Sequence, residues 1–324
     1  MPSPSGLSAQ LGVAEETVYG TPVTVTRFYE FTKETLKQDI KRIESAGLRS
    51  GTRVQRSDRW VSGAKSVGGV VTMELADRSF GLWWKHMLGG VASAQPDVGG
   101  NPTVWRHTFT PGDLPVGLTC QVGRTGMDTV TQPFTYHGCR VNEWELSAEV
   151  GNIATIAATL LGEDESTDIA LAVASYPASL GLMTFVNGTI TVAGAAIDVK
   201  EINLSGNNSL ANDRYFFGSR LRKQPTDNGM REYTGEIKSE FNDLVAYNRF
   251  VTGTEAALVL LFEGVTITGA FKYHTQITAN LRFDGETPTV EGPDGIEQSL
   301  PFKCVGNTAA TALTVQYQTT DVTP

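Results

Sequence analysis

Short runs of alternating apolar and polar side chains recur along most of the chain. Apolar residues at every second position, often β-branched and bounded by Gly, Asn, Asp or Pro, are typical of half-buried β-strands. The runs that fit this pattern cover residues 23–31, 69–75, 141–148, 153–161, 184–192, 236–241, 257–262 and 312–318. The pattern therefore predicts an all-β fold.

One segment has helical spacing instead. Its large apolar side chains lie three and four positions apart, at Phe80, Trp83, Trp84, Met87 and Leu88. Such spacing places them on one face of an amphipathic helix. Asp77 is available as an N-terminal cap, and the two glycines after Leu88 supply a stop. We expect one short helix over residues 77–88, packed on a sheet.

A short motif occurs twice along the chain. Three residues of the first copy recur 166 positions later, namely Gly69, Glu74 and Asp77 at Gly235, Glu240 and Asp243. In both copies a stretch with aromatic side chains follows the Asp, which is consistent with a short helix capped by it. Between the halves, residues 163–168 are acidic and polar, and an alanine-rich stretch follows. These features predict a duplication, with one domain at residues 1–165 and a second at residues 166–324.

Each half also contains, before the repeated strand, a long polar stretch that does not alternate. Residues 43–67 hold five basic side chains against two acidic ones, and residues 212–224 hold four against one. Such stretches bury too little apolar surface to order themselves, so they are flexible tips or arms that order on contact with a partner. The candidate contact residues are Arg49, Arg53, Arg56, Arg59, Trp60 and Lys65 in the first arm, and Arg214, Tyr215, Phe216, Phe217, Arg220, Arg222 and Lys223 in the second, whose loop extends to residue 231.

The chain as a whole is acidic, with a formal net charge of -9 at pH 7. This balance disfavours a protein that grips nucleic acid, because phosphate binding relies on clustered Lys and Arg. The complementary partner for two basic arms is another copy of the same acidic protein, in a head-to-tail contact that can propagate. We therefore predict self-assembly through the arms. Solvated loops and nucleic-acid binding by the arms are the alternatives.

Catalytic signatures are absent from the sequence. It has no GxSxG, HExxH or P-loop motif, and its four histidines are scattered. The three cysteines are widely spaced and match no zinc pattern, so we expect free thiols, no metal and no cofactor. The N-terminus does not resemble a secretory leader, and no apolar run approaches 18 residues. We expect a soluble protein that is not an enzyme and does not enter a membrane.

A row of carboxylates is the remaining candidate feature. Glu143, Glu145 and Glu149 alternate with apolar residues, so a strand would place them on one face. Three interpretations fit such a row: a glycosidase-like acid pair, a solvated strand face, or the wall of a water-filled channel. Glu74, Glu236 and Glu240 are weaker candidates for the same surface.

Several strings of the chain resemble major tail tube proteins of long-tailed phages of the siphophage type, especially those that infect actinobacteria. In the first half these are residues 7–22, which begin Leu-Ser-Ala-Gln-Leu-Gly-Val, and residues 27–31, 42–49 and 56–60. In the second half they are residues 202–208, 218–220 and 231–235. None of these strings is a catalytic signature, so their number and order carry the resemblance.

The resemblance implies tail-tube domains of the β-sandwich type, whose inner sheets join around a ring into a large barrel. A long loop and the N-terminal arm would lock onto the next ring, and stacked rings would form the conduit for genomic DNA and for the tape-measure protein. Two such domains in one chain suggest trimeric rings with pseudo-sixfold symmetry, with hexameric rings as the alternative.

Such a protein would be assembled in the host cytoplasm, would reside in the virion tail and would meet the tail-tip and tail-terminator proteins. The carboxylates would face the lumen, where negative charge repels phosphates and lets DNA slide without tight binding. A capsid decoration protein is the nearest alternative. A surface-layer or fimbrial subunit lacks a supporting leader, and a tail-spike enzyme would have a larger, repetitive sequence.

Overall fold

The computed structural model of the protein describes residues 5–128, 130–285, 287–290, 292, 295–307 and 309–324. Its first half contains β1 (Gln10–Glu15), β2 (Arg27–Tyr29), β3 (Lys33–Glu34), β4 (Lys37–Glu44), β5 (Trp60–Glu74), α1 (Gly81–Leu88), β6 (Gly89–Ala94), β7 (Trp105–Pro111), β8 (Leu118–Thr125), β9 (Thr131–Glu149), β10 (Thr155–Gly162) and β11 (Asp164–Ser166). Its second half contains β12 (Gly188–Val192), β13 (Ala195–Ala196), β14 (Val199–Asn207), β15 (Glu232–Glu240), α2 (Val245–Thr252), β16 (Ala256–Thr268), β17 (Phe271–Phe283), β18 (Glu297–Cys304) and β19 (Leu313–Thr319). Two short 3-10 helices, η1 (Gly6–Ser8) and η2 (Phe185–Asn187), complete the described elements, and the predicted all-β class is confirmed.

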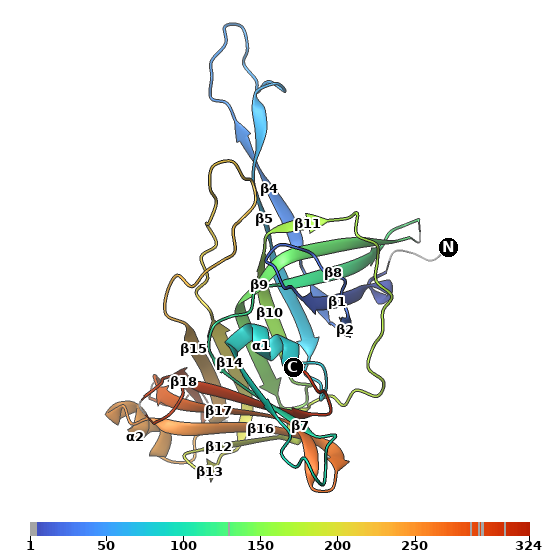
Figure 1. The fold of residues 1–324 in the computed structure, drawn as a ribbon. Helices are drawn as coiled ribbons and strands as arrows, with labels where there is room; N and C mark the ends of the chain where they lie inside the picture. Colours follow the sequence, from blue (N-terminus) through green and yellow to red (C-terminus); the bar gives the residue numbers. More distant parts are fainter. Residues whose placement is uncertain (1–4, 129, 286, 291, 293–294, 308) are drawn as a thin grey trace.

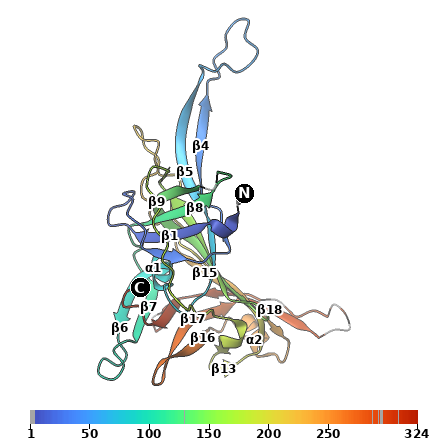
Figure 2. The same cartoon turned by 90° about the vertical axis from the view of Figure 1, so that its right-hand side faces the viewer.

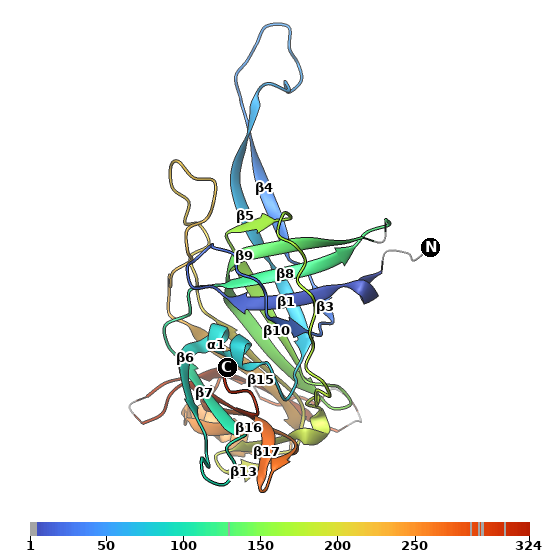
Figure 3. The same ribbon diagram turned by 45° about the vertical axis from the view of Figure 1, so that its right-hand side comes forward.

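Strand pairing follows the same order in both halves (Figures 1 and 3). The first half is ordered β2–β1–β8–β9–β10–β5–β4, and every pair is antiparallel. The second half is ordered β13–β12–β16–β17–β18–β15–β14, again antiparallel throughout. The repeated glycines hold equivalent places, because Gly69 faces Leu160 and Gly235 faces Phe302. Each of these pairs joins the strand before the helix, β5 or β15, to a strand that comes late in the sequence of its half, β10 or β18.

Two strand pairs join the halves. Strand β9 pairs with β14 from Glu143 opposite Asn207 to Glu149 opposite Glu201, so one sheet runs through both halves. Strand β7 pairs with β19 near the C-terminus. At the first joint the Trp144 ring lies over Gly206, where a Cβ would come within 2.3 Å of the ring. A glycine is therefore needed for the two backbones to approach at this point.

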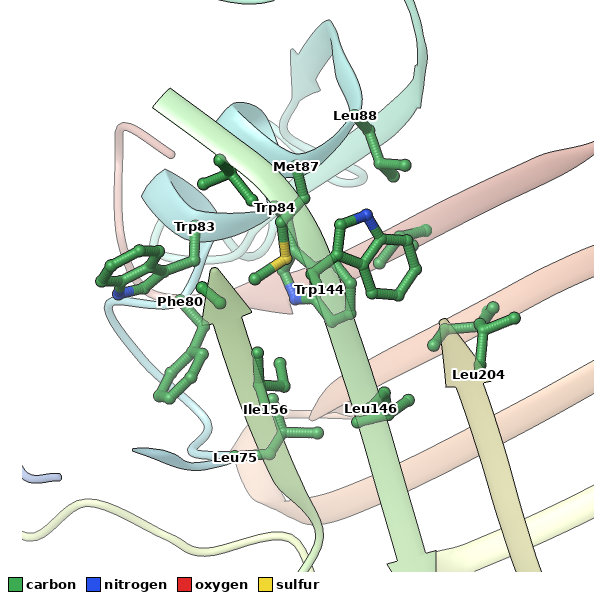
Figure 4. Close-up of a cluster of buried hydrophobic side chains, with 14 of the residues drawn as sticks. Leu75, Phe80, Trp83, Trp84, Met87, Leu88, Trp144, Leu146, Ile156 and Leu204 are labelled. Carbon is green, nitrogen blue, oxygen red and sulfur yellow. The ribbon is translucent and has the colours of Figure 1, made fainter. Parts of the chain in front are cut away.

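Helix α1 closes the core of the first half (Figure 4). Seven of its eight residues are buried. The Trp84 ring packs edge-on against Trp144 of β9, with centroids 5.9 Å apart, and Trp83 packs edge-on against Tyr29 at 5.7 Å. The predicted spacing and the stop at Gly89 are confirmed.

The predicted cap of α1 is wrong. The helix begins at Gly81, and no side chain accepts a hydrogen bond at its N-cap, Phe80. Asp77 is buried, and its N–H donates to the Gly181 carbonyl. Ser79 has a positive φ of 72°, which breaks the helical path between Asp77 and Gly81. In the second half the N-cap of α2 is Leu244, again without a side-chain cap, and the Asp243 carboxylate accepts a hydrogen bond from the Val245 N–H at 2.8 Å just before it.

Two strand predictions also need correction. Of residues 23–31 only Arg27–Tyr29 is a strand, and residues 184–192 begin with η2 before β12 starts at Gly188. The reason in the second case is local, because the Asn187 amide oxygen accepts a hydrogen bond from the Thr184 N–H at 3.0 Å. Such a capping contact turns the chain before the strand can begin.

The first polar arm is shorter than predicted. Strands β4 and β5 form a hairpin that takes in both ends of residues 43–67, which leaves only residues 45–59 irregular. The hairpin extends well beyond the rest of the molecule (Figures 1 and 2). Residues 212–224, by contrast, contain no regular strand or helix.

Candidate functional site: a polar sheet face and two basic arms

Six neighbouring strands share one polar face. Their order is β5–β10–β9–β14–β15–β18, and the strands come from both halves. One row of paired residues across them is Glu74, Thr155, Ser147, Asn203, Glu236 and Pro301, and the next is Thr72, Ala157, Glu145, Ser205, Thr234 and Lys303. Residues between these rows, such as Ile156, Leu146 and Leu204, are buried in the core. The sheet therefore has one apolar side and one open polar side.

All six glutamates named from the sequence lie on this face. Glu143, Glu145 and Glu149 are exposed and alternate with the buried Trp144, Leu146 and Ala148. The others are Glu74, Glu236 and Glu240, of which the first two are half-buried. Sequence reasoning missed Glu201, Glu232 and Glu297, which share the same face. The alternation of Glu201, Asn203 and Ser205 with buried Ile202 and Leu204 was the available signal.

The carboxylates on the two sides of the face have different partners. In the second half, Lys238 pairs with Glu201 at 2.7 Å and Lys303 pairs with Glu232 at 2.7 Å. Lys200 lies 2.8 Å from Glu297 and 3.2 Å from Glu240.

The carboxylates of β9 have polar but uncharged neighbours. Within the part of the chain that the structure describes, no Lys or Arg nitrogen lies within 4.0 Å of Glu143, Glu145 or Glu149. Glu143 accepts a hydrogen bond from the Asn207 amide at 3.1 Å, and Glu149 accepts one from Asn152 at 2.8 Å. Strand β9 therefore presents carboxylates that form no direct ion pair on the polar face.

The tip of the β4–β5 hairpin carries the first basic arm. Arg49, Arg53 and Arg59 are exposed, whereas Arg56 pairs with Asp58 at 2.5 Å. Trp60 stands at the base of the tip, 46% exposed, with the Arg42 guanidinium 5.2 Å from its ring centroid. These side chains have few contacts within the chain, so they are free to meet a partner.

The second arm folds back onto the hairpin. The Tyr215 hydroxyl donates to the Lys65 carbonyl at 2.8 Å, and the Arg220 guanidinium donates to the Gly63 carbonyl at 2.8 Å. The Lys65 N–H in turn donates to the Arg220 carbonyl at 2.9 Å. These contacts fix residues 212–224 against the stem of the hairpin, so the two arms form one unit.

Several predicted contact residues are therefore engaged within the chain. Arg222 is only 4% exposed and lies against the Tyr215 ring, so its side chain points inward and not towards a partner. Arg214 donates to the Gln224 carbonyl, and the Lys65 ammonium pairs with Asp164 at 2.9 Å. Of the predicted contact residues in the second arm, Phe216, Phe217, Arg220 and Lys223 stay exposed, although Arg220 also donates to the hairpin.

A carboxylate pair lies beneath this arm. Glu16 is buried and accepts hydrogen bonds from the Gly138 N–H at 2.8 Å and from the Thr119 hydroxyl at 2.9 Å. Glu163 lies close by, and burial together with the charge of Glu16 raises its pKa above the ordinary 4.5, against the opposing effect of Lys223. The folded chain therefore disfavours the ionised form of Glu163.

This carboxylate gives a pH-dependent stability. Because the pKa of Glu163 is raised in the folded chain, its contribution to stability declines as the pH rises through 4.5 and above. We expect Glu163→Gln to raise the melting temperature at about pH 7 and to change it little at about pH 4. Thermal unfolding at both pH values measures this, with Glu30→Gln, an exposed carboxylate, as control. A variant that is destabilised equally at both values would contradict it.

The histidines and cysteines do not converge on a site. Cys120, Cys139 and Cys304 are free thiols buried in the core. Among the described residues, no group of three or more His, Cys, Asp and Glu side chains is placed to hold a metal ion. Neither described α-helix is long and apolar enough to cross a membrane.

An open polar sheet face and a projecting basic hairpin are typical of a structural protein that assembles with other copies. A family model for phage tail tube proteins matches residues 6–304, which is nearly the whole chain. No curated protein matches the chain. With most of both halves covered by the family model, the chain belongs to the phage tail tube proteins and is a structural subunit of the tail tube.

Proposed function

We propose that this subunit closes into rings that stack into the tube, with the polar face of β5, β10, β9, β14, β15 and β18 lining the channel. The observation that carries the proposal is the continuity of this face across both halves, with its apolar side buried and its polar side open. A channel for DNA needs a wall that is wetted and does not bind phosphates. Glu143, Glu145 and Glu149, which form no direct ion pair, supply that property.

Each half of the chain is one tube domain in this proposal, residues 1–165 and 166–324. The identical order of strand pairing in the two halves supports the duplication. Three chains of two domains then supply six units, so we infer trimeric rings of pseudo-sixfold symmetry. Hexameric rings of whole chains are the alternative.

The pairing of β9 with β14 inside the chain joins one proposed tube domain to the next, and we propose that neighbouring copies close the ring in the same way. There the C-terminal part of β9, which lies beyond its pairing with β8, pairs with the edge strand of the second half, β14, over residues 143–149 and 201–207. Strand β4 corresponds to β14 and, among the described residues, has a partner strand on its β5 side alone. An open edge of this kind is a template for another chain. We propose that β3 and β4 of one copy continue the sheet of the next, which makes a large barrel.

The arms connect successive rings. Arg49, Arg53, Arg59 and Trp60 on the hairpin, together with Phe216, Phe217 and Lys223 beside it, would meet the acidic surface of the next ring. Hot spots of protein interfaces are enriched in such residues. Tyr215 and Arg220 would support this contact by holding the second arm on the hairpin. Lys65 would support it by its pair with Asp164, and Arg56, Arg214 and Arg222 by contacts within their own arms.

The partners follow from this role. The tube would enclose the tape-measure protein before ejection and genomic DNA during it, and its ends would meet the tail-tip and tail-terminator proteins. We propose a siphophage-type tail assembled in the host cytoplasm, without enzymatic activity in this subunit. A capsid decoration protein is the alternative from the sequence, and the family match favours the tube.

Electron microscopy of the purified, concentrated protein tests the proposal. Hollow tubes whose end-on views average to threefold rings with six similar units are expected. Rings with true sixfold symmetry would keep the tube and exclude the trimer. Isolated subunits that assemble only on a capsid lattice would support decoration instead.

A further inference from the structure

The two equivalent helices differ sharply in burial. In α1 seven of eight residues are buried, whereas α2 has none. Leu244 at the N-cap of α2 is 56% exposed, Val245 is 49% exposed and Val251 is 61% exposed. Helix α2 therefore leaves apolar side chains uncovered on the surface of the single chain.

Part of the cover of α1 comes from the other half of the chain, in addition to β6, β7 and β9 of its own half. The Asn208 amide donates to the Met87 carbonyl at 3.1 Å, and the Arg231 guanidinium donates to the Leu88 carbonyl at 3.2 Å. Trp144, which packs on Trp84, also contacts Tyr233 of β15. The segment that follows β14 is buried by this contact, with Asn208 at 0%, Leu210 at 7% and Ala211 at 8% exposed.

The counterpart of this covering segment is the base of the β4–β5 hairpin. Asn207 faces Glu232 in one hairpin, and Asp39 faces Ser66 in the other. Glu232 and Ser66 are 166 positions apart, as in the repeated motif, so residues 208–211 correspond to residues 40–43. There the apolar side chains are uncovered, because Ile43 is 58% exposed and its cross-strand partner Val61 is 62% exposed.

At the joint between the halves, α1 and residues 208–211 cover each other. Their counterparts, α2 and residues 40–43, are both uncovered in the single chain. They cannot meet within one molecule, since α2 and the hairpin lie at opposite ends of it (Figures 1 and 2). We infer that α2 of one copy docks against residues 40–43 and Val61 of a second copy, as α1 docks against residues 208–211. This inference rests on the proposed ring. It adds a second contact between neighbouring copies to the proposed pairing of their strand edges.

A cysteine pair tests the contact directly. Met87 and Val251 are each the seventh residue of their eight-residue helices, and Asn208, whose amide donates to the Met87 main-chain carbonyl, corresponds to Ile40. The double variant Ile40→Cys with Val251→Cys should give covalent oligomers on mild oxidation, since the native thiols are all buried. Leu48→Cys with Val251→Cys is the matched control, because Leu48 lies in the hairpin tip and should leave most chains uncrosslinked.

The same samples are examined for tubes by electron microscopy, which separates the two ideas. Cross-linked oligomers within tubes support both. Tubes without cross-links overturn the α2 contact and leave the proposed function standing, whereas cross-links without rings or tubes support the contact and count against the function. The absence of both overturns both. Val251→Asp should also abolish assembly of a folded subunit, and Val98→Asp, at an exposed loop, should not.

Discussion

Replacement of residues 45–59 by a two-residue Asn-Gly turn is expected to leave a folded subunit that no longer stacks into tubes. The tip lies beyond the core, so its removal deletes no buried contact of the sheet. Asn-Gly suits the tight turn that joins two antiparallel strands. The variant should unfold at the wild-type temperature, form rings and stop there, which electron microscopy and sedimentation can show. Tubes of wild-type length would contradict the proposed role of the hairpin.

A milder variant separates charge from length. The triple change Arg49→Gln, Arg53→Gln and Arg59→Gln keeps the hairpin and removes its exposed guanidinium groups. If each contributes ~1 kcal/mol to the contact, the critical concentration for tubes should rise about 100-fold. The control is Lys272→Gln with Arg282→Gln, which removes two basic groups from β17, outside the arms and outside the β3 and β4 edge. The control should polymerise normally, and added salt should weaken the wild-type tubes in the same direction as the triple change.

Local patterns in the sequence were sufficient to predict which face of a strand or helix is buried. The alternation of Glu143, Glu145 and Glu149 with apolar residues fixes the two faces of β9, because side chains on a strand alternate with a period of two. The spacing of Trp83, Trp84 and Met87 likewise fixes the buried face of α1. Family resemblance then supplied the function, which the chemistry of the residues did not determine.

Features that depend on distant contacts could not be predicted. The inward turn of Arg222 depends on how the second arm meets the hairpin, and nothing near it in the sequence encodes that contact. The pairs β9–β14 and β7–β19 join strands far apart in the chain. Asp77 had the right chemistry for a cap, but a tertiary hydrogen bond to Gly181 holds it elsewhere. For Asp77 tertiary packing overrode a local preference, and for the other features no local preference existed to predict them.

Charge reversal of the β9 row is expected to have the largest effect on function. Changing Glu143, Glu145 and Glu149 to lysine would put three cations per chain on the polar face, where no basic partner now compensates the carboxylates. The face lies away from the core, so the subunit should still fold and assemble. If the face lines the channel, DNA in transit would meet repeated rows of lysine and would release counterions on binding them.

Two measurements follow from this reversal. Phage carrying the variant should eject their DNA more slowly than wild type, and more slowly at low salt than at high salt, because counterion release weakens as salt rises. Assembled variant tubes should also retain short duplex DNA, with a loss of retention between roughly 50 and 200 mM salt. Glutamine at the same three positions removes the repulsion without adding attraction, so it should give an intermediate ejection rate.

The control must carry the same change of charge on another surface. Glu30→Lys, Asp168→Lys and Glu255→Lys reverse three exposed acids that lie outside the six-stranded face. Ejection by that phage should match wild type, since charges farther from DNA than the Debye length of ~10 Å are screened. Normal ejection kinetics in the β9 variant, with tubes intact, would mean that another surface lines the channel. The assignment of the chain to a tube would stand, and the assignment of this face to the channel would fall, because the β9 variant tests only which face the DNA meets.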